Sequence, residues 1–130
     1  METELKTILC IDDDPDILTI ARVALETFGG LTTATCSSGR EGIREAQAWQ
    51  PNLILMDVMM PDLDGPATLE LLRRDSSVAS RIPVVFMTAR VERSDVDNYL
   101  ALGAAAVIAK PFDPLTLSGD LNTIWRRLAA

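Results

Sequence analysis

Five short apolar runs recur along this chain, and their spacing is the feature that most limits its fold. The runs occupy residues 7–11, 31–36, 53–56, 84–87 and 106–109. Each run is too short for a typical helix, and its Val, Ile, Leu and Thr residues favour extended backbone. We therefore predict five β-strands.

The segments between these runs have helical periodicity, with apolar residues every three or four positions along one face. The first such face is formed by Ile17, Ile20, Ala21, Ala24 and Phe28. The last is formed by Leu117, Leu121, Ile124, Trp125 and Leu128. Strand and helix thus alternate along the whole chain.

Helix boundary signals agree with this division. Gly29-Gly30 can close the first helix and Gly103 the fourth. Ser38 and Glu41 have the spacing of a capping box, which predicts the start of the second helix. Continuous apolar strands that alternate with helices indicate a parallel sheet covered on both faces. We expect a doubly wound, five-stranded α/β fold that forms one domain over residues 1–130.

Charge and composition exclude several classes of function. A net charge of −7 would on average repel nucleic acid and anionic lipid, so we expect no direct nucleic-acid binding. No apolar run approaches the roughly 20 residues that span a bilayer, and the start of the sequence lacks a positive secretory signal. We therefore expect a cytoplasmic protein without membrane insertion. Cys10 and Cys36 lie in apolar runs without metal-ligand spacing, which favours reduced, packed thiols.

The chain contains no histidine, which narrows its chemistry further. Nucleophile systems that depend on imidazole are excluded, and so are histidine metal ligands. Any reaction at this protein must use carboxylates, hydroxyls and amines.

The aspartates of the stretch IDDDPD, at residues 11–16, form an acidic cluster directly after the first apolar run. Asp14 precedes Pro15 in the manner of an N-cap, and Asp16 falls in the first helical turn, where negative charge is favourable. Asp12 and Asp13 have no such structural explanation. We expect both to face solvent at the carboxyl edge of the sheet, where doubly wound folds bind their ligands.

A third carboxylate, Asp57, ends the third apolar run. If the first and third strands are neighbours, it meets Asp12 and Asp13, and three close carboxylates need a cation among them. Mg²⁺ is the natural choice, because it binds a few carboxylates together with waters and a phosphate. The alternative, that Asp12 and Asp13 are merely solvated loop acids, is weakened by the third carboxylate.

The fourth and fifth strands add a hydroxyl and an ammonium at the same edge, from Thr88 and Lys110. Lys110 and Lys6 are the only lysines, so Lys110 is not readily explained as a solubilising charge. A lysine can pair with a carboxylate or phosphoryl oxygen, and a threonine can donate to another oxygen. Taken alone, a threonine such as Thr88 is more often a strand-end cap than a binding residue.

Four sequence blocks, ILCIDDDPDI, LILMDVMMPDLDG, VVFMTA and IAKPF, together resemble the receiver domain of two-component response regulators. The resemblance covers about residues 6–128, and its blocks are far apart, which makes it specific. It implies the flavodoxin-like (βα)5 fold with strand order 2-1-3-4-5, which is known for this family. That order would place the first strand beside the third.

The resemblance also implies a role for each residue at this edge. Asp57 would accept a phosphoryl group from a phosphohistidine of a sensor histidine kinase or a histidine phosphotransfer protein. Asp13 would bind Mg²⁺ directly, with Asp12 as a second acid near the metal and the carbonyl of Met59 as the remaining protein ligand. The chain would then be a signalling receiver, catalysing only its own phosphorylation and dephosphorylation.

Thr88 and Lys110 would contact the phosphoryl oxygens, and Lys110 would pair with Asp57 before phosphorylation. The Lys110-Pro111 bond resembles the family's cis peptide. With no histidine of its own, the chain needs its donor in trans. An unidentified downstream protein would read the phosphorylated surface.

The sequence departs from the family at several positions. The residue three before the lysine is often aromatic in the family, and its ring swings inward when the threonine moves; here it is Val107. Ala105-Ala106 replaces an acidic pair, which makes the surface there less polar. Met59 and Arg90 occupy variable positions that tune phosphoryl lifetime in the family.

Two other functions stay open beside the phosphorylated switch. One is a small Mg²⁺-dependent phosphatase with Asp57 as its nucleophile, although such enzymes of the haloacid-dehalogenase type carry a second acid where this chain has Met59. The other is a receiver-like interaction module that is not phosphorylated, which the loss of an acid, the threonine or the lysine would mark. None is lost. Either the chain acts alone or it is part of a longer regulator.

Overall fold

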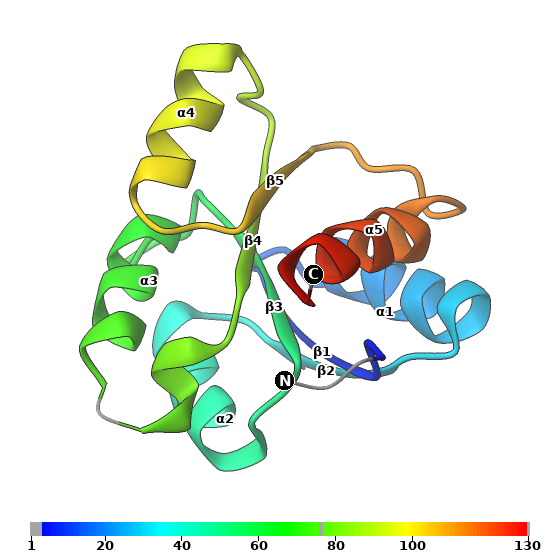
Figure 1. The fold of residues 1–130 in the computed structure, drawn as a ribbon, viewed down its shortest axis with the longest axis horizontal. Coiled ribbons are helices and arrows are strands. Elements are labelled where there is room, and N and C mark those ends of the chain that lie inside the picture. Colours follow the sequence, from blue (N-terminus) through cyan, green and yellow to red (C-terminus); the bar gives the residue numbers. More distant parts are fainter. Residues whose placement is uncertain (1–3, 76, 130) are drawn as a thin grey trace.

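A computed structural model describes residues 4–75 and 77–129 and contains one five-stranded parallel sheet (Figure 1). The strand order is β2-β1-β3-β4-β5. The strands are β1 (Thr7–Ile11), β2 (Thr32–Cys36), β3 (Leu53–Asp57), β4 (Val84–Thr88) and β5 (Ala106–Ala109). The predicted fold is confirmed. β3 and β4 each extend one residue beyond their predicted ends, so that Asp57 and Thr88 belong to the ladder.

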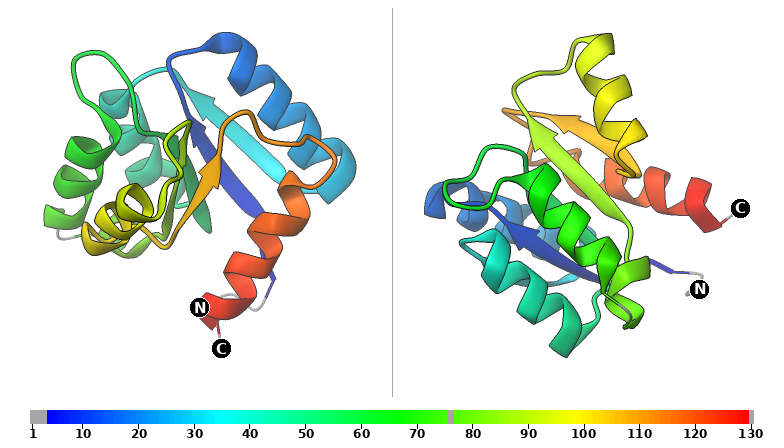
Figure 2. Two further views of the ribbon diagram at one scale, coloured as in Figure 1. Left: turned by 90° about the horizontal axis from the view of Figure 1, so that it is seen from above. Right: turned by 90° about the vertical axis from the view of Figure 1, so that its left-hand side faces the viewer.

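Helices cover both faces of this sheet. They are α1 (Pro15–Gly29), α2 (Gly39–Trp49), α3 (Gly65–Arg74), α4 (Arg93–Ala101) and α5 (Leu117–Ala129), together with a short 3-10 helix, η1 (Val78–Arg81), that the sequence did not predict. Helices α1 and α5 lie on one face, and α2, α3 and α4 on the other (Figures 1 and 2). No helix in the described part of the chain is long and apolar enough to cross a membrane.

The sheet separates two apolar cores, and successive residues of one strand point into different cores. Leu9 and Ile11 belong to the core beneath α2 and α3, whereas Ile8 and Cys10 belong to the core beneath α1 and α5. Central strands therefore have no polar face, which explains their continuous apolar runs. The edge strand β5 is only partly buried.

The two cysteines lie in different cores, Cys10 beneath α1 and Cys36 on the opposite face. Both are free thiols. Burial, followed by the charge of Asp12, raises the pKa of Cys10 to about 12, and burial with nearby glutamates raises that of Cys36 to about 11. Thiols held protonated in this way are poor nucleophiles, as expected for packing residues.

Most of the predicted helix boundaries are confirmed. The Asp14 carboxylate caps α1, and Gly30 closes the helix in the left-handed conformation with φ of 64°. The Ser38 hydroxyl accepts the N–H of Glu41 at 3.2 Å, as a capping residue does. The reciprocal half of the capping box is not formed, because the Glu41 carboxylate accepts the Ser37 hydroxyl instead.

The predicted inner face of α1 is partly wrong. Ile20 is 43% exposed and Phe28 is 56% exposed, whereas Ala21, Ala24 and Leu25 are buried. The two alanines let the helix axis approach the sheet, and Leu25, which the sequence pattern left out of this face, is buried with them. Leu128 of the last predicted face is likewise 38% exposed.

Candidate functional site

Four polar side chains stand at the carboxyl edge of the sheet because four parallel strands end there. Asp12 and Lys110 each follow the last residue of their strands, β1 and β5, while Asp57 and Thr88 are the last residues of β3 and β4. The register pairs β1 with β3, β3 with β4 and β4 with β5. Neighbouring strand ends therefore place side chains far apart in sequence next to one another.

Three carboxylates converge at this edge, as the sequence predicted. Asp12, Asp13 and Asp57 each present an oxygen within 4.8 Å of the other two. Asp57 is buried and Asp13 is exposed, so the group opens toward solvent on one side.

Asp12 differs from the prediction, because it is fully buried rather than facing solvent. Its backbone N–H continues the strand ladder by donating to the carbonyl of Cys36 at 3.1 Å. Its side chain accepts the N–H of Asp14 at 2.9 Å and the ammonium of Lys110 at 2.7 Å. A buried carboxylate is tolerable here because both of its oxygens have donors.

Lys110 lies across the gap from the carboxylates. Its Nζ atom is 2.7 Å from Asp12 Oδ2 and 3.2 Å from Asp57 Oδ1. The ion pair with Asp12 was missed by the sequence reasoning, which paired Lys110 with Asp57 alone. Burial lowers the pKa of Lys110, but hydrogen bonds and charge attraction, first from Asp12 and then from Asp57, outweigh it and raise that pKa.

The pKa of Asp57 is raised above its ordinary value. Burial is the largest cause and the negative charge of Asp12 the next, while Lys110 and a hydrogen bond from the backbone of Met59 act in the opposite direction. The carboxylate thus lacks enough positive charge around it, which is the condition that a bound cation would relieve.

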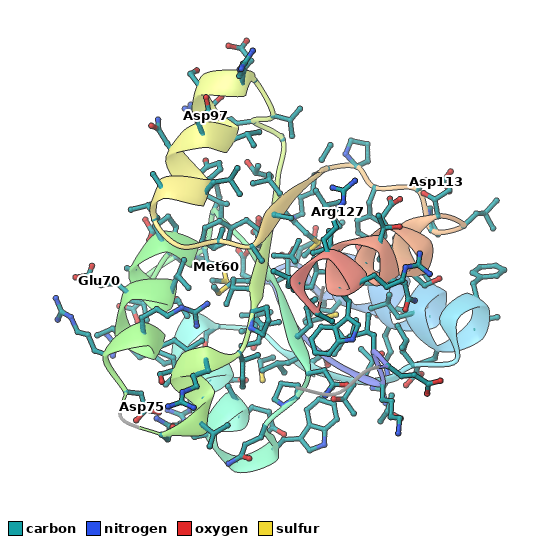
Figure 3. All side chains as sticks on the ribbon, in the orientation of Figure 1. Met60, Glu70, Asp75, Asp97, Asp113 and Arg127 are labelled. Carbon is teal, nitrogen blue, oxygen red and sulfur yellow. The ribbon has the colours of Figure 1, made fainter. Side chains whose placement is uncertain are left out.

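Thr88 and the loop after Asp57 complete the edge. The Thr88 side chain is buried, and its hydroxyl accepts the N–H of Arg90 at 3.0 Å, so it does serve as a strand-end cap. Met59 is 73% exposed and Met60 is 8% exposed; Figure 3 shows Met60 turned inward beside α3. The Lys110-Pro111 peptide is cis.

Gly65, the first residue of α3, is a part of this site that the sequence reasoning did not single out. A Cβ atom there would lie 2.7 Å from the carbonyl oxygen of Asp57 and 2.9 Å from Val58 Cα. The Gly65 N–H donates to the Val58 carbonyl at 2.9 Å. Only a glycine lets the start of α3 lie this close to the backbone of Asp57, and the Asp64-Gly65 pair before a helix was the available signal.

The donor set suits a hard divalent cation. Three carboxylates supply oxygens, one of them is open to solvent, and the nearby ammonium is placed to hold a further anion. Mg²⁺ binds through a small number of carboxylates and keeps other positions for water and phosphate oxygens. The residues at this edge therefore fit a magnesium site beside a phosphate site.

Val107 lies in register beside Phe86 of β4. Ala105, just before β5, and Ala106, its first residue, are both partly buried. The surface of this edge strand is therefore apolar and carries no aromatic ring.

A comparison with models of protein families matches most of this chain to one family. The family model described as the response regulator receiver domain matches residues 8–122. A probable transcriptional regulator, ycf27, of Cyanophora paradoxa is 35% identical over 127 residues, which cover 98% of this chain and 51% of the relative. The Bacillus subtilis alkaline phosphatase synthesis transcriptional regulatory protein PhoP is 35% identical over 122 residues, which cover 94% of this chain and 49% of that protein.

Solved structures agree with the family match. The chemotaxis response regulator CheY4 of Vibrio cholerae superimposes with a TM-score of 0.84 at 26% identity, over 93% of this chain and 99% of that one. The chain thus spans nearly all of that regulator but only about half the length of the curated relatives it matches.

Proposed function

We propose that this chain, which belongs to the response regulator receiver domain family, is a phosphorylatable switch that accepts a phosphoryl group on Asp57. The observation that supports this most directly is the meeting of Asp12, Asp13 and Asp57 within 4.8 Å, opposite the ammonium of Lys110. The donor is a phosphohistidine on a sensor histidine kinase or a histidine phosphotransfer protein.

In the transfer, a carboxylate oxygen of Asp57 attacks the phosphorus, and the bond between phosphorus and the donor's imidazole nitrogen breaks. The imidazole leaves with the electron pair of that bond and takes up a proton. The negative charge that spreads over the equatorial phosphoryl oxygens needs cations held in place beforehand. Lys110 provides one, because the acceptor carboxylate and a buried partner already hold its ammonium at the reaction edge.

Mg²⁺ bound at this edge would neutralise charge on the phosphoryl oxygens. Asp13 and Asp57 would hold it directly, and the carbonyl of Met59 would be a further ligand. Asp12 is buried and already paired with Lys110, so we assign it a role through a metal-bound water or through the position of the lysine.

Thr88 is proposed to bind a phosphoryl oxygen through its hydroxyl. That hydroxyl now accepts a backbone N–H, so its own proton is free to be donated to an incoming oxygen. The complete set of acids, hydroxyl and ammonium favours phosphorylation over a module that only binds partners, and Met59 in place of a second acid disfavours turnover of external phosphate esters.

The experiment is labelling with acetyl phosphate and Mg²⁺, followed by intact-mass measurement and peptide mapping. Wild type should gain one phosphate at Asp57, and Asp57→Asn should gain none. Asp62→Asn is the matched control, since Asp62 is exposed in the following loop, where its carboxylate pairs with Arg40 at 3.0 Å. An unshifted wild-type mass would overturn the proposal.

We further propose that residues 1–130 form a single receiver domain of a cytoplasmic signalling protein. Phosphorylation would alter a surface read by a downstream protein. The domain itself makes no contact with nucleic acid in this proposal, because its net charge of −7 opposes one. The relatives named as transcriptional regulators are about twice as long, so any such activity would belong to the whole protein.

A further inference from the structure

Helix α4 is the most weakly anchored of the helices. Within the described residues it has no fully buried side chain, and Glu92 at its N-cap makes no side-chain capping bond. Asp97 points outward from it in Figure 3. Its C-terminal end is better fixed, because the N–H of Ala104 donates to the carbonyl of Tyr99 and Ala105 joins the sheet. A helix held in this way can change position at a small cost in free energy.

One aromatic contact joins α4 to the core. The ring of Tyr99, which is partly buried, meets the ring of Phe86 edge-on, with centroids 5.5 Å apart and planes at 75°. Phe86 is completely buried in β4. This is the arrangement that the charge distribution of aromatic rings prefers.

The Phe86 ring also lies close to Gly65, the first residue of α3, which packs against the backbone of Asp57. A Cβ atom on Gly65 would lie 3.2 Å from Phe86 Cε1 and 2.7 Å from the carbonyl oxygen of Asp57. Phe86 therefore lies against the start of α3, beside the backbone of Asp57, and also touches α4 through Tyr99. Its register neighbour on β5 is Val107, which leaves Tyr99 as the aromatic partner of Phe86.

We propose that the Phe86–Tyr99 ring pair couples the phosphorylation state of Asp57 to the position of α4. This inference rests on the proposed function. Phosphorylation draws the residues around Asp57 toward the new group, Gly65 moves with the backbone that it touches, and the Phe86 ring follows. The edge-on contact with Tyr99 then breaks or reforms, and α4 changes between two positions.

The size of the effect follows from the ring contact. Forming or breaking an aromatic pair of this geometry changes the equilibrium constant between the two positions of α4 by roughly two- to twelve-fold. A helix without buried residues or a capping bond has few other contacts to oppose a change of that size. The coupling therefore requires a shift in population rather than unfolding of the helix.

The test is hydrogen–deuterium exchange of the α4 amides, with and without acetyl phosphate and Mg²⁺, in Tyr99→Leu and Tyr99→Phe. The leucine removes the ring, and the phenylalanine keeps it. Leu100→Ala is the matched control, because Leu100 is the next residue of the helix and is 42% exposed. Intact mass measures the phosphate on the same samples, and circular dichroism confirms folding.

We expect phosphorylation to change α4 exchange by roughly two-fold or more in wild type, Tyr99→Phe and Leu100→Ala. In Tyr99→Leu the phosphate should still be gained but the change in exchange should be lost. Phe86→Leu breaks the pair from the core side and should give the same loss. An unchanged response in Tyr99→Leu, or a phosphorylated wild type without any response in α4, would overturn the coupling. A wild type that gains no phosphate would instead overturn the proposed function, and the coupling with it.

Discussion

The ammonium of Lys110 is closer to Asp12 than to Asp57, with Nζ 2.7 Å from Asp12 Oδ2 and 3.2 Å from Asp57 Oδ1. The shorter contact goes to the fully buried carboxylate and the longer one to the proposed phosphoacceptor. A lysine anchored mainly by Asp12 keeps its place when the charge and shape of Asp57 change. Asp12 is thereby a positioning residue for Lys110 as well as a member of the acidic cluster.

Lys110→Met should destabilise the protein, because it leaves the buried carboxylate of Asp12 without its cation. Loss of one partner of a buried ion pair costs about 3 kcal/mol. Urea denaturation in the presence of a chelator measures this loss. Lys6→Met, at the only other lysine and on an exposed residue, should change the free energy of unfolding by no more than about 0.5 kcal/mol. Equal effects of the two variants would show that the pairing with Asp12 is unimportant for stability.

Metal-free stability should depend on the pH through Asp57. Its pKa is raised above the ordinary value of 3.8, by burial first and then by Asp12, so the folded protein holds this proton more tightly than the unfolded chain. As the pH rises from 3.8 through the raised value, the unfolded state loses the proton first, and this group lowers the free energy of unfolding. Asp57→Asn should remove this pH-dependent fall in the free energy of unfolding.

Asp57→Asn should therefore exceed wild type in stability above this pH window, and the difference should shrink toward lower pH. Chemical denaturation at a series of pH values, with a chelator present, checks it. Asp62→Asn, at an exposed carboxylate, should show no such trend. Added Mg²⁺ should remove the advantage, because the cation stabilises the ionised carboxylates of wild type. A constant difference at all pH values would contradict the proposed electrostatic cause.

Asp13→Asn should weaken Mg²⁺ binding with little change in stability. Asp13 is the exposed member of the cluster and has neither the burial nor the lysine contact of Asp12. We expect at least about a ten-fold loss of affinity, since even outer-shell substitutions at metal sites cost that much. Isothermal titration calorimetry with MgCl2 measures it. Asp16→Asn, at an exposed acid outside the cluster, should bind Mg²⁺ like wild type. An equal loss of Mg²⁺ affinity in Asp13→Asn and Asp16→Asn would instead indicate general attraction by the negative charge of the protein.

The sequence was sufficient to place Asp57, Thr88 and Lys110 at one edge, because parallel strands that alternate with helices must end on the same side. It was not sufficient to show the burial of Asp12. That burial depends on an ion pair with Lys110 across 98 residues of sequence, and no local pattern encodes such a contact. The exposure of Ile20 and Phe28 was missed for a related reason, because the packing of α1 against the sheet, which buries Leu25 instead, is not encoded in the local sequence pattern.

Gly65→Ala should disturb the phosphorylation edge more than a methyl group on a helix normally would. The new Cβ would lie 2.7 Å from the Asp57 carbonyl oxygen and 3.2 Å from Phe86 Cε1, so the backbone or the ring must shift. Overpacking of this kind costs about 1–3 kcal/mol. Denaturant unfolding measures the cost, and intact mass after a fixed time with acetyl phosphate and Mg²⁺ measures the rate of labelling.

We expect both the stability and the labelling rate of Gly65→Ala to fall, because the loop that bears Met59 is held by the same close approach. Gly119→Ala is the matched control: it adds the same methyl group within α5, where the new Cβ would meet no described atom within 4 Å beyond the neighbouring residues and backbone of its own helix. That control should gain up to about 1 kcal/mol from the better helix propensity of alanine and label at the wild-type rate. If Gly65→Ala had the same stability and the same labelling rate as Gly119→Ala, the contact of α3 with the Asp57 backbone would not be what positions the acceptor carboxylate.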